Sequence, residues 1–288
     1  MKSTTRSAPL LVTGPTGSVG RSLVSQLLAA GARVRALARK PASANLPAEV
    51  EVFQGDLASG ELEPGALDGV RQVFVFPAQP GVGSFCALLA KAGVEHAVVL
   101  SSLAAALEHA RDRDSSTATH HLAVERDVRA SGIAEVTVLR PGTFANNLLA
   151  WSRPIRAGTP VELAWPGSAQ APIHEADIAA VAAAVLLSPT HRGETLPMTG
   201  PESLTRVAQL AAIGRAIGRP LAHREVSPAH FAASSAAFIP AAIVELLLAY
   251  WSDTARVPDV VRPTVAEVTG RPARSLEEWT RGHASAFV

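Results

Sequence analysis

The sequence predicts an α/β protein with a doubly wound parallel sheet and a smaller, mostly helical C-terminal lobe. Three observations predict it. Short apolar runs alternate with helical segments in the first half of the chain, a glycine-rich turn follows the first run, and alanine-rich helices dominate the second half. A chain of 288 residues has the length of one large α/β domain, or of one domain with an appendage.

Six apolar runs are the expected strands of the sheet. Continuous apolar runs are typical of strands that helices cover on both faces. The carboxyl ends of such strands form the ligand crevice of this fold class. The expected strands are 9–13, 33–38, 50–53, 73–76, 97–100 and 136–139.

Helical segments are expected between these strands. Residues 21–30 carry apolar side chains on one helical face, and Gly31 stands at a C-cap position. No clean linker separates the two halves, so we expect them to pack as one unit. The other expected helices are 85–92, 119–130, 178–187, 204–217 and 240–252, with strand-like pieces near 161–163 and 222–226.

Composition excludes several classes of protein. Lys+Arg is 26 against Asp+Glu 25, and this balance argues against nucleic acid as a partner. Cys86 is the only cysteine, so an intrachain disulfide or a cysteine-based zinc cluster cannot form. The most apolar stretch, 236–251, contains Pro240 and Glu245 and is too short to span a membrane. We expect a cytoplasmic protein that binds neither nucleic acid nor membrane and has no metal site. The apolar C-terminal helices are compatible with a homodimer.

The strongest motif is a glycine-rich turn between the first expected strand and the first expected helix. Its glycines permit a tight turn and close approach of a diphosphate, which the N–H groups of the helix N-terminus can bind. This context predicts a dinucleotide-binding Rossmann core over residues 1–150, and a substrate-side lobe over 151–288 with segments that return to the core. The turn consists of Gly14, Pro15, Thr16, Gly17, Ser18, Val19 and Gly20.

Two basic residues at the end of the second strand predict NADP(H) as the cofactor. An NAD-preferring site usually has an acidic residue here, about 20 residues after the turn, whereas this chain has Arg39 and Lys40. Arginine can bind a 2′-phosphate with paired hydrogen bonds. The alternative is that both are solvated loop charges. After the third strand, Asp56 and Leu57 are expected near the adenine, although Asp56 can equally cap a turn.

These residues resemble the NmrA-like group of atypical short-chain dehydrogenases/reductases, over nearly the whole chain. The resemblance implies a Rossmann fold and a dinucleotide cofactor. It leaves the acceptor open, because the group includes quinone and dye reductases, polyketide-pathway reductases and non-enzymatic redox sensors. The matching segments are 14–20, 34–39, 100–102, 121–125, 139–144 with 146–147, 172–174 with 177–179, 199–202 and 268–272.

The usual catalytic pair of short-chain dehydrogenases, a Tyr four residues before a Lys, cannot form here. Tyr250 is the only tyrosine and lies far from the expected helix. His121 and Glu125 occupy the corresponding spacing and share one helix face. We expect His121 to supply a proton, since imidazole titrates near neutral pH, and Glu125 to orient or contact the ribose. The alternative is that His121 is a structural residue that only shapes the pocket.

The other candidate site residues follow the later strands. Ser101 and Ser102 are candidates to bind the nicotinamide or a substrate carbonyl, with capping as the alternative. The remaining candidates for the cofactor are Pro77, Ala78, Gln79, Pro141, Gly142, Thr143 and Phe144, and those for the substrate are Phe144, Asn147, Trp151 and Trp165.

These observations predict an NADPH-dependent oxidoreductase that transfers hydride to a planar, apolar acceptor. A quinone, an enone or an aromatic or polyketide ketone can delocalise the charge that it gains, so it needs less help from a strong acid. The alternative is a non-catalytic regulator that senses NADP(H) with the same fold.

Overall fold

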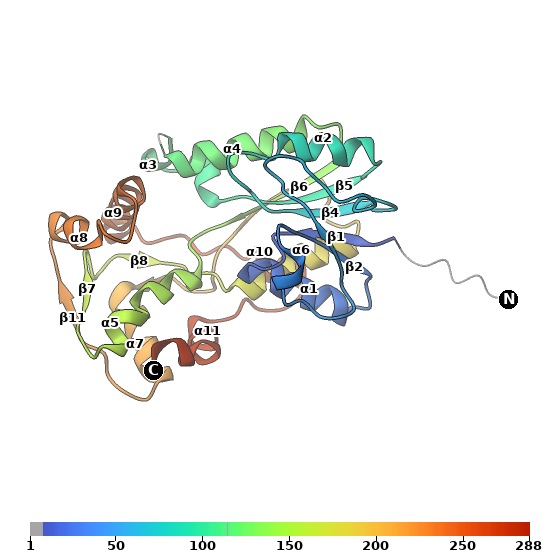
Figure 1. The fold of residues 1–288 in the computed structure, drawn as a ribbon. Helices are drawn as coiled ribbons and strands as arrows, with labels where there is room; N and C mark the ends of the chain where they lie inside the picture. The colour runs from blue at the N-terminus through green and yellow to red at the C-terminus, as the bar shows by residue number, and fades with distance from the viewer. Residues whose placement is uncertain (1–7, 114) are drawn as a thin grey trace.

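A seven-stranded parallel sheet forms the centre of the computed structural model, which describes residues 8–113 and 115–288 (Figure 1). The strand order is β3-β2-β1-β4-β5-β6-β9. This order is doubly wound, because β1 and β4 lie side by side at the centre and later strands extend outwards in both directions. The strands are β1 (Leu10–Thr13), β2 (Val34–Ala38), β3 (Glu51–Gln54), β4 (Gln72–Val75), β5 (His96–Leu100), β6 (Glu135–Pro141) and β9 (Thr195–Met198).

The predicted parallel sheet is confirmed, and all six expected strands form. The seventh strand, β9, is absent from the sequence prediction. Its four residues include Pro197, which weakens a strand pattern. Proline is tolerated because β9 lies at the edge of the sheet, paired only with β6.

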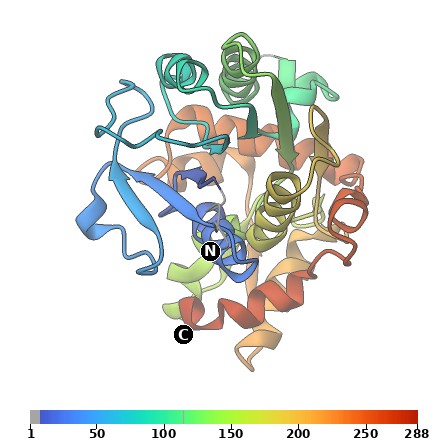
Figure 2. The same ribbon diagram turned by 90° about the vertical axis from the view of Figure 1, so that its right-hand side faces the viewer.

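Helices cover both faces of the sheet (Figure 2). One apolar core forms beneath α1 and α6, which pack on each other, and a second forms beneath α2 and α4. Nearly every side chain of α6 is buried, since it is enclosed by α1, the sheet and α10. These helices are α1 (Ser18–Ala29), α2 (Gly83–Lys91), α4 (Ser116–Arg129), α6 (Glu175–Leu187) and α10 (Thr264–Thr269).

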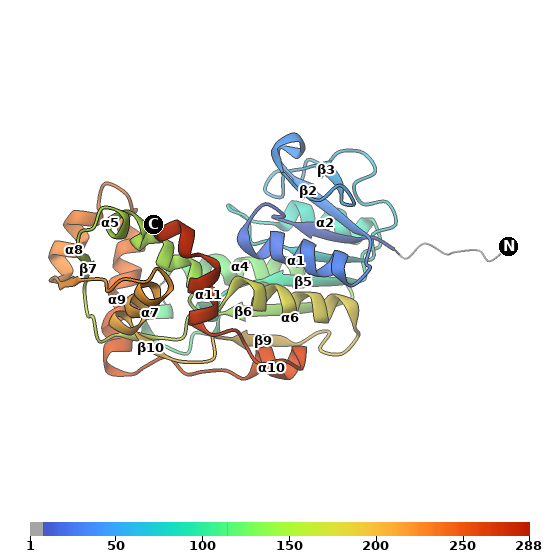
Figure 3. The ribbon, with the colours of Figure 1, turned by 90° about the horizontal axis from the view of Figure 1, so that it is seen from below.

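The remaining elements form a lobe beside the carboxyl ends of the strands (Figures 1 and 3). Its own apolar core contains Trp279 and Phe287, both fully buried. Residues 204 and 205, expected in a helix, pair instead with β8. The elements are α5 (Ser152–Arg156), β7 (Val161–Leu163), β8 (Ala169–Gln170), β10 (Leu204–Thr205), α7 (Arg206–Ala216), β11 (His223–Glu225), α8 (Pro228–Ser235), α9 (Ala241–Arg256) and α11 (Leu276–Gly282).

Two short connections complete the path of the chain near the carboxyl end of β5: the 3-10 helix Leu103–Ala106 and the short helix α3 (Ala110–Arg113). The 3-10 helices Pro41–Ser43, Ala145–Trp151 and Ala284–Phe287 lie after β2, after β6 and at the C-terminus. Within the described ranges, no helix has both the length and the apolar character needed to cross a bilayer.

Candidate active site

The glycine-rich turn connects β1 to α1 in a conformation that requires glycine at two positions. Gly14 has φ +61°, a left-handed conformation, and a Cβ there would lie 2.9 Å from Phe76. A Cβ on Gly20 would lie 2.1 Å from the carbonyl oxygen of Gly14. The turn therefore packs directly against its own helix, as the motif predicted.

The turn presents its tip to solvent. Pro15 is buried, whereas residues 16–18 are exposed. No side chain caps the N-terminus of α1, whose N-cap residue is Gly17. Arg21 braces the turn from behind, because its guanidinium donates hydrogen bonds to the carbonyl oxygens of Thr16, Asn45 and Ala44 at 3.1, 2.9 and 3.0 Å. The N–H groups of the first helical turn are thus left for an anion.

A hollow of about 380 Å³ lies at the carboxyl ends of β2 and β3, and Arg39 lines it. No described residue forms an ion pair or a hydrogen bond with the Arg39 guanidinium, and Lys40 beside it is exposed. Asp56 also lines the hollow, but its Oδ1 caps a turn by accepting from the N–H of Ala58 at 2.8 Å. This is the second of the two roles considered for Asp56.

A larger cavity, of about 430 Å³, lies at the carboxyl ends of β4, β5 and β6. The strand ends contribute Phe76, Pro77, Ser101, Ser102 and residues 142–144 to its wall, and α4 contributes His121. The opposite wall comes from the lobe, through Leu246, Leu247 and Tyr250 of α9 and through the segment 257–262.

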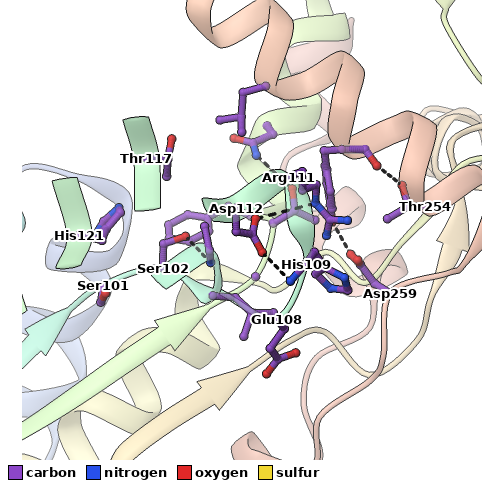
Figure 4. Close-up of a pocket in the computed structure, with 18 of the residues that line it drawn as sticks. Ser101, Ser102, Glu108, His109, Arg111, Asp112, Thr117, His121, Thr254 and Asp259 are labelled. Atoms are coloured by element: carbon purple, nitrogen blue, oxygen red, sulfur yellow. Dashed lines mark hydrogen bonds and ion pairs between the residues drawn. The ribbon is translucent and has the colours of Figure 1, made fainter. Parts of the chain in front are cut away.

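The cavity differs in character at its two ends. Figure 4 shows Ser101 and His121 at one side and Arg111, Thr254 and Asp259 at the other. Where the strands end, the wall is mainly apolar, apart from hydroxyl groups and the His121 ring. A planar molecule that enters between the sheet and α9 therefore meets an apolar slot with few polar groups.

A buried ion pair lies directly behind the strand end at Ser101. Glu125 of α4, 5% exposed, accepts hydrogen bonds from Nε and Nη2 of Arg140 at 2.9 and 2.7 Å. The Ser101 hydroxyl donates to the same carboxylate at 2.5 Å. This network links α4 to the carboxyl ends of β5 and β6, and so it holds the cavity wall in place.

Comparison with known proteins agrees with this geometry. The family model described as "NmrA-like family" matches residues 6–259. A (4-alkanoyl-5-oxo-2,5-dihydrofuran-3-yl)methyl phosphate reductase from Streptomyces griseus subsp. griseus is 37% identical, and the match covers 97% of this chain and 99% of that protein. The chain belongs to the NmrA-like family.

A further relative supports this assignment, and a solved structure shows the same fold. An NAD(P)H azoreductase from Xenophilus azovorans is 33% identical over 96% of this NmrA-like chain and 99% of its own length. The crystal structure of an NADPH-dependent quinone oxidoreductase from Escherichia coli in complex with NADPH has the same fold. That likeness has a TM-score of 0.77 at 23% identity and covers 95% of this chain and 99% of that one.

In this NmrA-like site, Glu125 is engaged within the protein. The sequence predicted that Glu125 orients or contacts a ribose, but both carboxylate oxygens are engaged by Arg140 and Ser101 within the protein. Arg140 was not among the predicted site residues. The sequence feature that could have identified Arg140 is an arginine at the end of a buried strand, because an unpaired charge there would be costly in free energy.

His121 lines the cavity, but its expected titration near neutral pH is corrected by the structure. Burial, with a smaller contribution from His120, lowers the pKa of the His121 ring to about 4. Its Nδ1 is buried and has no hydrogen-bond partner among the described residues. At pH 7 the ring is therefore neutral, so it can donate a hydrogen bond but does not carry the proton of an imidazolium.

Only two of the four residues expected at the substrate line the cavity. Phe144 and Asn147 line the cavity, whereas Trp151 and Trp165 do not. Trp151 lies instead beside the buried guanidinium of Arg206, 5.7 Å from the ring centroid. Tyr250 of α9 also lines the cavity; its remoteness along the chain excluded it only from the Tyr–Lys pair.

Three other predicted residues, Ser102, Leu57 and Ala78, make structural contacts. Ser102 caps the 3-10 helix that follows it, by accepting from the N–H of Ala104 at 3.3 Å. Leu57 belongs to the core beneath α2, and Ala78 packs against the same core. Among the described residues, no group of three or more His, Cys, Asp or Glu side chains is arranged to bind a metal ion.

We expect the fold to lose stability as the pH falls from about 6.5 to about 4, in part through His121. The folded ring has a pKa of about 4, while the unfolded ring titrates near ~6.5. The unfolded state therefore binds a proton in this window that the folded state does not. The part of the free energy of unfolding that depends on a neutral His121 is therefore fully present above the unfolded pKa. Its complete loss at low pH costs about 3 kcal/mol.

Urea unfolding of wild type and His121→Gln at pH 7 and 4.5 measures this contribution. We expect the variant to lose less stability between the two pH values than wild type does. His223→Gln, at an exposed position, is the matched control and should keep the wild-type difference. An unchanged difference in His121→Gln would contradict the assignment.

Proposed function

We propose that this NmrA-like protein is an NADPH-dependent reductase whose acceptor is a planar, mostly apolar compound with a polarised double bond. The acceptor classes are a quinone, an enone or an aromatic or polyketide ketone. The observation that carries the proposal is the cavity between the strand ends and α9, which is mainly apolar where the strands end and whose lining residue Phe76 lies against Gly14 of the turn.

The chain's residues fit a dinucleotide at the expected places. The N–H groups at the start of α1 bind the diphosphate, and Arg39 with Lys40 binds the 2′-phosphate of the adenosine half. Residues 77–79, Ser101 and residues 141–144 lie at the strand ends that border the nicotinamide half. When bound, NADPH supplies the hydride.

The protein positions the acceptor and excludes water from the slot. Phe144 and Phe76 flank a planar ring, and the neutral His121 ring offers a hydrogen bond to an oxygen of the acceptor. Such acceptors spread the negative charge that they gain over conjugated atoms, which reduces the need for the absent Tyr–Lys pair. The two curated relatives, reductases of a dihydrofuranone phosphate and of azo compounds, support a conjugated acceptor.

The test is a steady-state assay of NADPH oxidation with purified protein and a panel of quinones, cyclic enones and aryl ketones. We expect turnover with at least one class. Binding of NADP⁺ and NADPH by calorimetry, without oxidation of NADPH by any class, would overturn the reductase proposal and favour the non-catalytic sensor.

Arg39→Glu in the same assay tests the assignment of the cofactor. We expect KM for NADPH to rise by about 100-fold, or about 2.7 kcal/mol, while KM for NADH changes little. The 2′-phosphate would lose a guanidinium and gain a repelling carboxylate. Lys91→Glu, an equal change of charge on the exposed end of α2, is the control. Equal effects on both cofactors would contradict the role of Arg39.

A further inference from the structure

The end of the cavity farthest from Ser101 and His121 contains a fixed guanidinium. Arg111 of α3 lines the cavity, and its side chain is only 11% exposed. Its Nη1 donates a hydrogen bond to Asp253 of α9 at 2.9 Å, and its Cζ lies 5.0 Å from the centroid of the Tyr250 ring. The guanidinium is therefore held between α9 and its own helix (Figure 4).

Arg111 also has donor capacity left over. No described residue accepts a hydrogen bond from its Nη2, and that atom is not among the fully buried unpaired atoms, so it keeps some exposed surface. Its Nε has only an ion pair with Asp112, at 3.9 Å. An arginine carries five N–H donors in a rigid plane, so a guanidinium anchored on one edge presents the rest in a fixed direction.

Tyr250 does not compete for this role. Its hydroxyl donates to Asp259, and burial together with Asp259 raises the pKa of the phenol well above its ordinary value. Asp259 also accepts from the N–H of Ala171 at 3.3 Å. The Tyr250 proton is thus engaged, and the ring serves as a wall on which Arg111 rests.

The charges at this end leave no surplus of positive charge. Arg111 pairs with Asp253, and Arg262 pairs with Glu108 at 2.5 Å. Asp112 and Asp259 line the same end. These carboxylates would repel an anionic substituent, whereas they do not repel a neutral oxygen, which can accept a hydrogen bond from the free donors of Arg111.

We propose that this end of the cavity is a subsite for an uncharged oxygen substituent of the acceptor, a carbonyl or hydroxyl group, which accepts a hydrogen bond from Arg111. The subsite rests on the proposed reductase function for the nature of the acceptor. It adds that the acceptor has an oxygen substituent at a position remote from the carbon that receives hydride. A phosphate or sulfonate group at that remote position is disfavoured. Arg111 is a specificity residue in this arrangement.

Three compounds test the subsite: 1,4-naphthoquinone, its 5-hydroxy derivative and its 5-sulfonate. Dissociation constants for the NADP⁺-loaded protein are measured by calorimetry, and kcat/KM is measured with NADPH. We expect wild type to bind the hydroxy compound about ten-fold more tightly than the unsubstituted quinone, and to bind the sulfonate more weakly than either. In Arg111→Met the advantage of the hydroxy compound should disappear.

Arg113→Met is the matched control, since Arg113 lies on the same short helix but is exposed and does not line the cavity. It should keep the wild-type order of affinities. Thermal unfolding checks that each variant is folded.

Two results would overturn the subsite: a wild-type protein that does not favour the hydroxy compound or that prefers the sulfonate, and an Arg111→Met variant that weakens all three compounds equally. The wild-type comparison decides by itself if Arg111→Met does not fold. Binding in the expected order without oxidation of NADPH would instead contradict the reductase function and leave the subsite standing.

Discussion

The Gly20→Ala variant is expected to bind NADPH at least about 100-fold more weakly than wild type, a loss of about 2.7 kcal/mol. The added Cβ would lie 2.1 Å from the Gly14 carbonyl oxygen and 2.9 Å from the backbone of Pro15. Both contacts are with backbone atoms of the turn, so no side-chain rotation relieves them. The turn must move away from α1, and its N–H groups then no longer point at one phosphate position.

Two other glycine variants separate binding from folding. Gly282→Ala adds a Cβ at the end of α11 with nothing within 4 Å, and it should match wild type in both affinity and stability. Gly17→Ala places a Cβ 3.5 Å from the Gly14 oxygen, an ordinary contact, at the exposed tip of the turn. It should remain as stable as wild type and still lose affinity, because the methyl group obstructs the approach of a diphosphate. Calorimetry with NADPH and thermal unfolding measure both effects, and wild-type affinity in Gly20→Ala would refute the assignment of the turn.

The Glu125→Met variant is expected to lose about 3 to 5 kcal/mol of the free energy of unfolding. The substitution removes the carboxylate that pairs with both Nε and Nη2 of Arg140 and leaves that guanidinium mostly buried and unpaired. It also removes the acceptor of the Ser101 hydroxyl. Leaving one charge of a buried pair without its partner costs more than the pair contributes in net stability.

A double variant distinguishes this mechanism from simple loss of packing. Glu125→Met with Arg140→Met removes both charges and should recover most of the stability lost in the single variant. Exposed Glu95, which pairs with exposed Arg71, supplies the control: Glu95→Met should cost about 1 kcal/mol or less. Urea unfolding of the four proteins measures the differences. A double variant as unstable as Glu125→Met would show that the unpaired Arg140 is not the cause.

Most of the sheet and the dinucleotide turn could be predicted from the sequence because both depend on local patterns. Buried parallel strands are continuous apolar runs, and such runs marked six strands of the seven. The turn is specified by the spacing of three glycines between a strand and a helix. The strand β9 was missed because an edge strand containing Pro197 lacks that continuous apolar pattern.

The wall of the cavity opposite the strands could not be predicted from the sequence, because it brings together residues that are far apart along the chain. Arg111 and Tyr250 lie 139 positions apart by number, yet the guanidinium rests on the phenol ring. Trp151 follows β6 closely in the chain, and this proximity suggested a place at the substrate; in the structure it packs instead against Arg206 and the lobe core.

The sequence by itself determined the fold class, the diphosphate turn and the basic residues at the end of β2, since each depends on residues that are neighbours along the chain. The tertiary structure alone decided that His121 is neutral at pH 7, that Glu125 is bound to Arg140 and that α9 closes the cavity. The physical reason is that burial and ion pairing depend on which distant segments surround a side chain, and residue spacing carries no information about them.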